Sequence, residues 1–176
     1  IKTAAKPLTK LNETIISLEK TINENKKIYW VCPLIEESEK IDLAAAEDRY
    51  KSLKKHYSDN VLLIHGKMKA DEREQIMDEF KYGDTKILVS TTVIEVGIDI
   101  PEATVMIIEH AERFGLSQLH QLRGRVGRGS DQSSCLLLYQ APMGDNAKKR
   151  IETLRKTNDG FIIAEQDLLL RGSGEI

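Results

Sequence analysis

The stretch KILVSTTVIEVGIDIP, residues 86–101, decides the fold class of this chain. Its opening residues, 86–90, are mostly apolar and predict a buried strand that leads directly into the hydroxyl group of Thr91. Hydroxyl and backbone N–H groups at the carboxyl end of a strand lie where open α/β sheets bind their ligands. Asp99 follows shortly after Gly97 and can accept hydrogen bonds from a ribose, although in an ordinary loop it would only cap a turn.

The stretch QLHQLRGRVGRG, residues 118–129, carries two arginines on one side of a predicted helix. Its apolar residues recur at spacings of three and four, while Arg125 and Arg128 fall on a different side of the helical wheel. A guanidinium stays charged, and its planar fork of donors suits phosphate oxygens. Gly124 and Gly127 would each cost roughly 1 kcal/mol inside a helix, so they indicate a helix end or a close backbone approach. An isolated pair of arginines is more often a solvated helix face, but the glycine spacing and the preceding stretch favour a binding site.

Strands and helices are predicted to alternate along the chain. The predicted strands are 28–32, 61–64, 86–90, 103–109 and 134–139, and the predicted helices are 8–25 with Thr9 as its cap, 43–57, 71–82, 117–128 and 145–156. Helices of this length between strands imply crossover connections, and therefore a parallel sheet with helices on both faces. The sequence thus predicts an α/β fold.

The composition is typical of a soluble globular domain. Hydrophobic residues make up 40% of the chain, and no apolar run approaches the ~18 residues that a membrane span needs. The net charge of −2 argues against a globally basic nucleic-acid binder but leaves room for a local basic groove. Because the chain starts at Ile1 and not at a methionine, we interpret it as a piece of a longer protein. Its first residues therefore do not show whether that protein carries a targeting signal.

The two cysteines, Cys32 and Cys135, each lie in an apolar run without a second cysteine or a histidine at ligand spacing. This pattern predicts buried, reduced thiols in a cytoplasmic protein, and no metal site.

Taken together, residues 91–101 and 118–128 resemble motifs V and VI of the superfamily 2 helicases, and the pattern is most similar to the RecG family of DNA helicases. The resemblance implies a RecA-like motor domain over residues 1–143, followed over residues 144–176 by a helical extension with part of a translocation hairpin. It also implies that the full-length bacterial protein is an ATP-dependent DNA helicase. Such helicases remodel branched DNA, including stalled forks and Holliday junctions, in recombination and repair.

The resemblance assigns the nucleotide contacts residue by residue. Arg128 would be the catalytic arginine finger, and Arg125 would be its partner on the phosphates. Gln121 would help to sense the γ-phosphate, Asp99 would hold the ribose, and Gly97 would let the backbone approach the nucleotide.

The resemblance also places DNA-backbone contacts after three of the predicted strands. Pro33 falls at motif IV, Gly66 and Lys67 fall at motif IVa, and Thr91 opens motif V. Outside this context Pro33 would be an ordinary strand end and Lys67 an ordinary surface lysine.

The last third of the chain carries a different signal. Residues 145–156 form a basic helix, which is usually a solvated face and beside DNA would contact phosphates. Residues 157–172 resemble the translocation motif that RecG shares with the bacterial transcription-repair coupling factor. Within it, Glu165 and Arg171 are the expected coupling residues.

The chain contains neither the G-x-x-x-x-G-K-[S/T] loop that cradles phosphates nor a credible strand-terminal Asp-Glu pair for Mg²⁺. We therefore expect ATP with Mg²⁺ to be bound mainly by a first motor domain outside this chain, and the chain alone to be inactive. Expected partners are that domain, a DNA-binding wedge domain of the same protein, and branched or duplex DNA, with no membrane.

Two alternatives remain open at this point. One is the equivalent domain of the transcription-repair coupling factor, which a polymerase-binding module upstream would identify. The other is a non-catalytic α/β binding module of Rossmann type, although no G-x-G-x-x-G follows any predicted strand.

Overall fold

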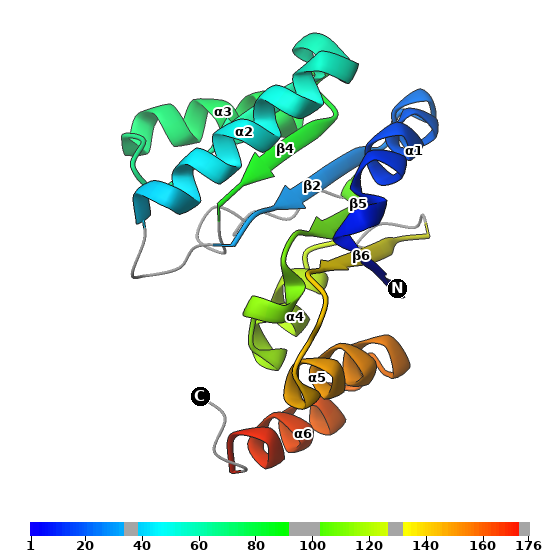
Figure 1. Ribbon diagram of the computed structural model, residues 1–176. Coiled ribbons are helices and arrows are strands. Elements are labelled where there is room, and N and C mark those ends of the chain that lie inside the picture. The colour runs from blue at the N-terminus through cyan, green and yellow to red at the C-terminus, as the bar shows by residue number, and fades with distance from the viewer. Residues whose placement is uncertain (34–38, 92–102, 127–131, 173–176) are drawn as a thin grey trace.

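The computed structural model describes residues 1–33, 39–91, 103–126 and 132–172. They form one six-stranded, all-parallel sheet in the order β1-β6-β5-β2-β4-β3 (Figure 1). The strands are β1 (Lys2–Pro7), β2 (Lys27–Val31), β3 (Val61–Ile64), β4 (Ile87–Ser90), β5 (Ala103–Ile108) and β6 (Ser134–Tyr139). The predicted parallel α/β sheet is confirmed.

Strand β1 lies outside the predicted strands. Its sequence, KTAAKP, is built from small and charged residues with low strand propensity. It becomes a strand because it pairs with β6 along its whole length, from Lys2 beside Ser134 to Pro7 beside Tyr139. It ends the strand order of the sheet, and edge strands tolerate lysine and proline better than central strands do.

Four of the five predicted helices are present with shifted ends and 145–156 with its predicted bounds, and the described part of the chain has six α-helices. They are α1 (Leu11–Asn23), α2 (Glu39–Tyr57), α3 (Ala70–Tyr82), α4 (Leu116–Arg123), α5 (Asp145–Lys156) and α6 (Gly160–Gly172). Short 3-10 helices are η1 (Leu8–Lys10), η3 (Ser58–Asn60) and η5 (Ala111–Arg113). The prediction of Thr9 as a cap is wrong, because α1 begins after η1 with Lys10 at its N-cap and no side-chain cap bond.

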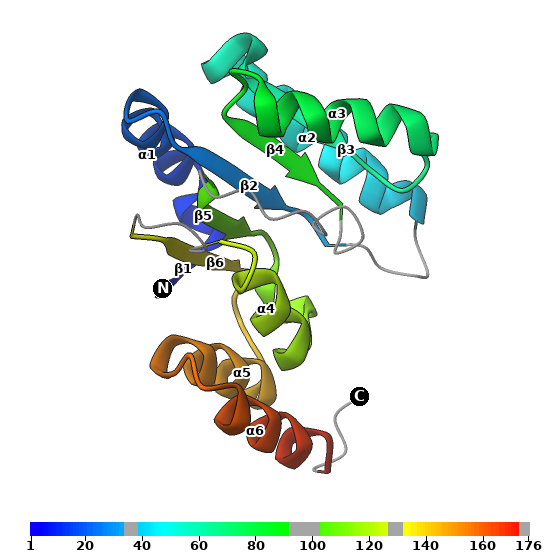
Figure 2. The same cartoon turned by 180° about the vertical axis from the view of Figure 1, so that it is seen from behind.

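Helices cover both faces of the sheet (Figures 1 and 2), and each face has its own apolar core. On one face Ile28 and Trp30 of β2 pack with α1 and α2. On the other face Tyr29 and Val31 of the same strand pack with α3, α4, α5 and α6. The split follows from the alternation of side chains along a strand, and it leaves β2 buried on both sides.

The helices of the C-terminal extension share a core with the sheet. Ile151 and Leu154 of α5 and Ile163 and Leu170 of α6 belong to the same apolar cluster as the side chains of α4. The division of the chain at residues 143 and 144 stays a prediction, but the two parts pack together through one hydrophobic cluster.

Both cysteines are buried and free, as predicted. Burial raises the pKa of Cys32 well above its usual value and raises the pKa of Cys135 to about 12. Both therefore stay protonated thiols near neutral pH.

Within the described ranges, no helix is both long and apolar enough to cross a membrane. The same residues contain no group of three or more His, Cys, Asp or Glu side chains that could hold a metal ion.

Candidate functional site

The predicted DNA-contacting residues lie along one part of the carboxyl edge of the sheet. Pro33 lies just beyond β2, Gly66 and Lys67 follow β3, and Thr91 directly follows β4. Strands β2, β4 and β3 are neighbours and run in the same direction, so their carboxyl ends meet at this edge. Gly66 and Lys67 are exposed, whereas Pro33 is buried and Thr91 is only 3% exposed. Of these four residues, Gly66 and Lys67 are therefore the ones that a ligand can reach directly.

Of the five predicted nucleotide contacts, the structure describes Gln121 on helix α4 and Arg125 just beyond the end of that helix. Gln121 is exposed on the helix, and Arg125 is half-buried just beyond its end. Within the described ranges Arg125 has no ion-pair partner. The other three predicted nucleotide contacts, Gly97, Asp99 and Arg128, lie outside the described residues.

The prediction of a helix to residue 128 is wrong, because α4 ends at Arg123. Gly124 is its C-cap and donates its N–H to the carbonyl of His120, at 3.1 Å. The backbone N–H of Arg125 then donates a hydrogen bond to the carbonyl of Leu122, at 3.0 Å. Of the two interpretations of the glycines, a helix end is confirmed at Gly124.

Arg123 is a buried cation that the sequence analysis missed. Its side chain is 1% exposed and donates from Nη1 to the carbonyl of Leu154 on α5, at 2.5 Å, and to Oγ1 of Thr3 on β1, at 3.3 Å. Its Nη2 lies 3.1 Å from Nδ1 of His120. A helical wheel could have found it, because it follows Leu116 and Leu119 on the buried side of α4. It joins α4 to α5 and β1.

Helix α6 is joined to α4 by a second polar contact. Oγ of Ser117 donates to Oδ2 of Asp167 at 2.9 Å, and Nε of Arg171 lies 3.2 Å from the same carboxylate oxygen. Of the two predicted coupling residues, Arg171 thus contacts the residue that holds α6 on α4. Glu165 is exposed, and no hydrogen bond or ion pair links it to the described part of the chain.

We expect His120 to make this region less stable in acid. Burial, first, and the neighbouring guanidinium of Arg123, second, lower the pKa of His120. The unfolded chain then takes up the proton more readily than the folded chain. The histidine's contribution to stability is therefore complete above its unfolded pKa of about 6.5 and is lost as the pH falls toward the lower folded pKa.

The measurement is urea unfolding of the chain and of His120→Gln at about pH 7.5 and about pH 5.5. The unaltered chain should lose more free energy of unfolding between these conditions than the variant does. Equal losses would contradict a role for His120.

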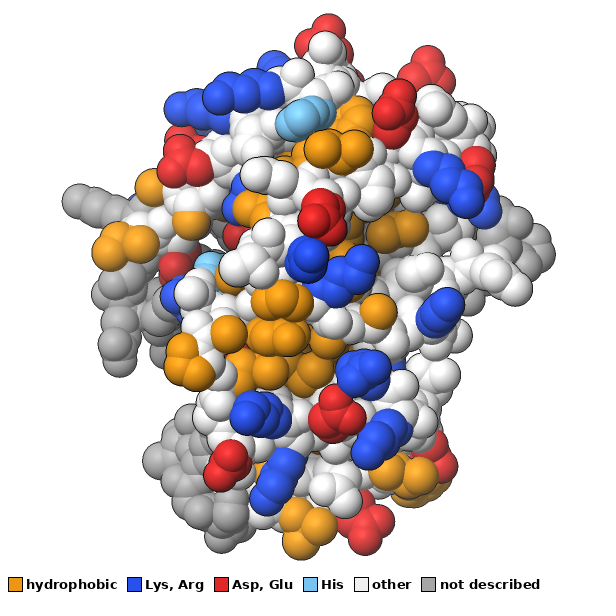
Figure 3. Space-filling view, turned by 45° about the vertical axis from the view of Figure 1, so that its right-hand side comes forward, with side chains coloured by type: hydrophobic (Ala, Val, Ile, Leu, Met, Phe, Trp, Pro, Cys, Tyr) orange, Lys and Arg blue, Asp and Glu red, His pale blue; other side chains and the backbone are white. Residues whose placement is uncertain are grey.

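The basic helix α5 does not present a continuous row of free cations. Arg155 and Lys156 both approach Glu152, with N···O distances of 2.8 and 3.9 Å. Figure 3 shows Lys, Arg and acidic side chains below an apolar patch. Ala5 of β1, Tyr139 of β6 and Met143 line a hollow beside Ile151 of α5. This arrangement favours the solvated-face interpretation for Arg155 and Lys156.

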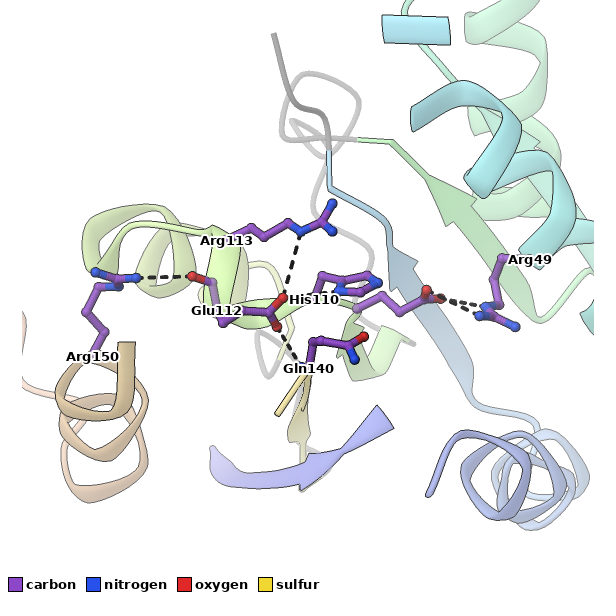
Figure 4. Close-up of polar contacts among 7 residues, drawn as sticks. Arg49, His110, Glu112, Arg113, Gln140 and Arg150 are labelled. Carbon is purple, nitrogen blue, oxygen red and sulfur yellow. Dashed lines mark hydrogen bonds and ion pairs between the residues drawn. The ribbon is translucent and has the colours of Figure 1, made fainter. Parts of the chain in front are cut away.

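Two carboxylates at the end of β5 organise the surrounding elements, and the sequence analysis missed both (Figure 4). Glu109 accepts hydrogen bonds from Trp30 and Arg49. Glu112 accepts the backbone N–H of Gln140 at 2.9 Å and lies 3.1 Å from Nδ1 of His110. Isolated acidic residues give no sequence signal for such contacts, because their partners are remote in sequence.

Glu112 is held ionised by these contacts. Burial alone would raise the pKa of Glu112, but hydrogen bonds from His110 and from the backbone of Gln140 outweigh it and leave the pKa below its usual value. The backbone carbonyl of Glu112 also accepts a hydrogen bond from Nη2 of Arg150 on α5, at 3.1 Å. Helix η5 is therefore fixed to β6 and to α5.

Residues 8–130 match the family model described as the helicase conserved C-terminal domain. The chain belongs to this family. Over 176 aligned residues, this helicase domain is 50% identical to the ATP-dependent DNA helicase RecG of Acidithiobacillus ferridurans; the alignment covers 99% of the chain and 26% of that protein. It is 49% identical to the RecG of Escherichia coli (strain K12), over 100% of the chain and 26% of that protein. The domain thus spans about a quarter of the length of these relatives.

Solved structures agree with this assignment. The helicase domain matches a structure of RecG bound to a three-way DNA junction with a TM-score of 0.83 and 41% identity, over 99% of this chain and 22% of that one. The yeast DEAD-box splicing factor Prp28 matches with a TM-score of 0.71 and 13% identity, over 95% of this chain and 36% of that one, which shows a shared fold alone. The predicted RecA-like helicase fold and the resemblance to RecG are confirmed.

Proposed function

We propose that this chain is the second motor domain of an ATP-dependent DNA helicase that remodels branched DNA, such as stalled forks and Holliday junctions, in recombination and repair. The observation that carries the proposal is the 50% identity to a RecG helicase over 99% of the chain. The relative of known structure, which is 41% identical, is bound to a three-way DNA junction.

On the nucleotide side, the domain would supply the cationic wall of a cleft between two motor domains. Arg128 would be the arginine finger, Arg125 would bind the phosphates, and Gln121 would sense the γ-phosphate. The half-buried position of Arg125, without an ion-pair partner in the described part of the chain, supports this role. Asp99 and Gly97 would hold the ribose and the adjoining backbone. Phosphoryl transfer depends mainly on positioning and on neutralising charge, which suits guanidinium groups.

ATP supplies the free energy of the cycle when it is hydrolysed, and Mg²⁺ would neutralise its phosphates. Most contacts to ATP and Mg²⁺ would come from the first motor domain of the same protein. A wedge domain of that protein would bind the DNA branch. The protein would work in the bacterial cytoplasm, where its buried thiols stay reduced.

On the DNA side, the carboxyl edge of β2, β4 and β3 would follow the phosphate backbone. The exposed Lys67 would contribute one cationic contact, and Gly66 beside it would allow the backbones to approach. Pro33 and Thr91 would complete the edge after a local rearrangement, because both residues are buried.

The C-terminal extension, residues 144–176, would pass movement of α4 to the DNA. Its support is the contact of Ser117 with Asp167, next to the predicted coupling residue Arg171. Glu165 on the exposed side of α6 would then face a partner of the helicase domain.

The function is tested with the full-length protein on a three-way DNA junction. We expect ATP-dependent strand separation of the junction and little separation of an unbranched duplex of the same length. A non-hydrolysable ATP analogue should abolish the reaction, and the 176-residue chain alone should show neither strand separation nor ATP turnover. ATP turnover that DNA does not stimulate, with no junction opening, would contradict the proposal.

A further inference from the structure

The carboxylate of Glu109 lies at the centre of a buried polar cluster, where the two halves of the sheet meet. Oε1 of Glu109 accepts hydrogen bonds from Nε1 of Trp30 at 2.8 Å and from Nε of Arg49 at 2.5 Å. Nη2 of Arg49 lies 3.2 Å from Oε2 of the same carboxylate, which makes the contact bidentate (Figure 4). Glu109 is 7% exposed, so the charge is largely removed from water.

The cluster crosses the only strand pair that joins the two halves of the described sheet. Strands β2, β4 and β3 form one half and carry the proposed DNA edge; β5, β6 and β1 form the other, with α4 and its proposed nucleotide contacts following β5. Glu109 belongs to the end of β5, whereas Trp30 lies on β2 and Arg49 on α2. The backbone N–H of Glu109 also donates to the carbonyl of Val31, at 2.9 Å.

The ion pair at this position fixes the relative placement of its two side chains more than it stabilises the fold. The desolvation of a buried ion pair largely offsets its Coulomb attraction, so an apolar side chain of similar size would stabilise the sheet about equally well. The paired guanidinium and carboxylate instead fix one angle and one distance, and the Trp30 ring, 5.7 Å from the guanidinium of Arg49, limits movement further. The arrangement is thus suited to holding two elements in one relative position.

Glu109 is rigidly connected to the segment that precedes α4. The next residue, His110, has a left-handed backbone with φ of 52°, an unfavourable conformation that persists only where neighbouring contacts hold it. Glu112 follows and is fixed to Gln140 and Arg150. A shift of β5 relative to β2 would therefore move η5 and α4 together and not be absorbed in a loose loop.

We propose that Glu109 is a positioning residue that fixes the DNA edge relative to the nucleotide-contacting helix α4, so that DNA binding stimulates ATP turnover. The inference rests on the proposed function and adds the link between its two sites. In this proposal Trp30 and Arg49 act through Glu109 and not through contacts of their own with DNA or nucleotide.

The test measures ATP turnover with and without a DNA junction in the full-length protein. Trp30→Phe keeps an aromatic ring but removes the N–H donor, and Glu109→Gln keeps the size but removes the charge. Both should lower the stimulation by DNA about tenfold, while the Kd for DNA and the Kd for a non-hydrolysable ATP analogue each stay within about twofold. Arg49→Lys keeps the charge without the fork and should fall between these variants and the unaltered protein.

Glu24→Gln is the matched control, because it removes an exposed carboxylate with a cationic neighbour, Lys26, at the edge of the sheet opposite to the cluster, and should leave the stimulation unchanged. Unchanged stimulation in folded Trp30→Phe and Glu109→Gln would overturn the inference. So would a loss of stimulation that only follows a loss of both binding affinities, since that describes partial unfolding. If DNA fails to stimulate even the unaltered protein, the proposed function itself has failed.

Discussion

Full-length protein with Arg128→Ala is expected to bind ATP nearly as tightly as the unaltered protein and to hydrolyse it about 10³ to 10⁵ times more slowly. An arginine finger neutralises charge that develops mainly in the transition state, so its loss lowers kcat much more than it weakens ground-state binding. The measurement is steady-state ATP turnover with saturating DNA, combined with the Kd of a non-hydrolysable analogue.

Lys20→Ala is the control for Arg128→Ala, because it removes one positive charge from the exposed side of α1. Turnover within about twofold of the unaltered protein is expected for this variant. If Arg128→Ala keeps its turnover as well, the finger assignment is wrong. If it loses ATP binding in proportion to turnover, Arg128 acts in ground-state binding and not as a finger.

The variant Lys27→Met is expected to lower the free energy of unfolding of the 176-residue chain by about 3 kcal/mol. Lys27 lies on β2 and is 4% exposed. Its ammonium donates to the carbonyls of Phe80, Lys81 and Gly83 at the end of α3, the last two at 3.1 and 3.3 Å. Methionine would fill the space but leave these carbonyls without their charged donor, at the negative end of the helix dipole.

The neighbouring Lys26 provides a matched control. Lys26 pairs with Glu24 at 3.6 Å near the surface, so Lys26→Met should change the free energy of unfolding by less than about 1 kcal/mol. Urea unfolding followed by circular dichroism measures both variants. Similar values for the two lysines would show that the contacts of Lys27 with α3 add little to stability.

Several elements could be predicted because their signals are local. The apolar stripe of α1 and the whole of α5 follow directly from spacings of three and four, and Gly124 marks the end of α4. The buried strands β2 to β6 follow from short apolar runs. Strand β1 could not be predicted, because its small and charged residues become a strand only through pairing with β6.

The residues of the candidate site also differ in whether their sequence signal is local. Gln121 and Arg125 could be named as candidates because their motif lies within one short stretch, and Gly66 and Lys67 because they follow a recognisable strand; the roles of all four stay predictions. Arg123 was missed, since its partners Leu154 and Thr3 lie far away along the chain and meet it only on the folded sheet. Gly97, Asp99 and Arg128 lie outside the described residues and stay predictions.

The sequence by itself determined the parallel α/β fold, the family resemblance and the residue types expected to bind phosphate, because hydrophobic periodicity and motif spacing depend on residues close together in the chain. Only the tertiary structure decided that Glu109 joins Trp30 and Arg49 across the middle of the sheet, and that Glu112 joins η5 to β6 and α5. The strand order places β2 beside β5 although they are distant in sequence. The partners of a buried charge are brought together by the strand order, so no pattern of neighbouring residues could have predicted these contacts.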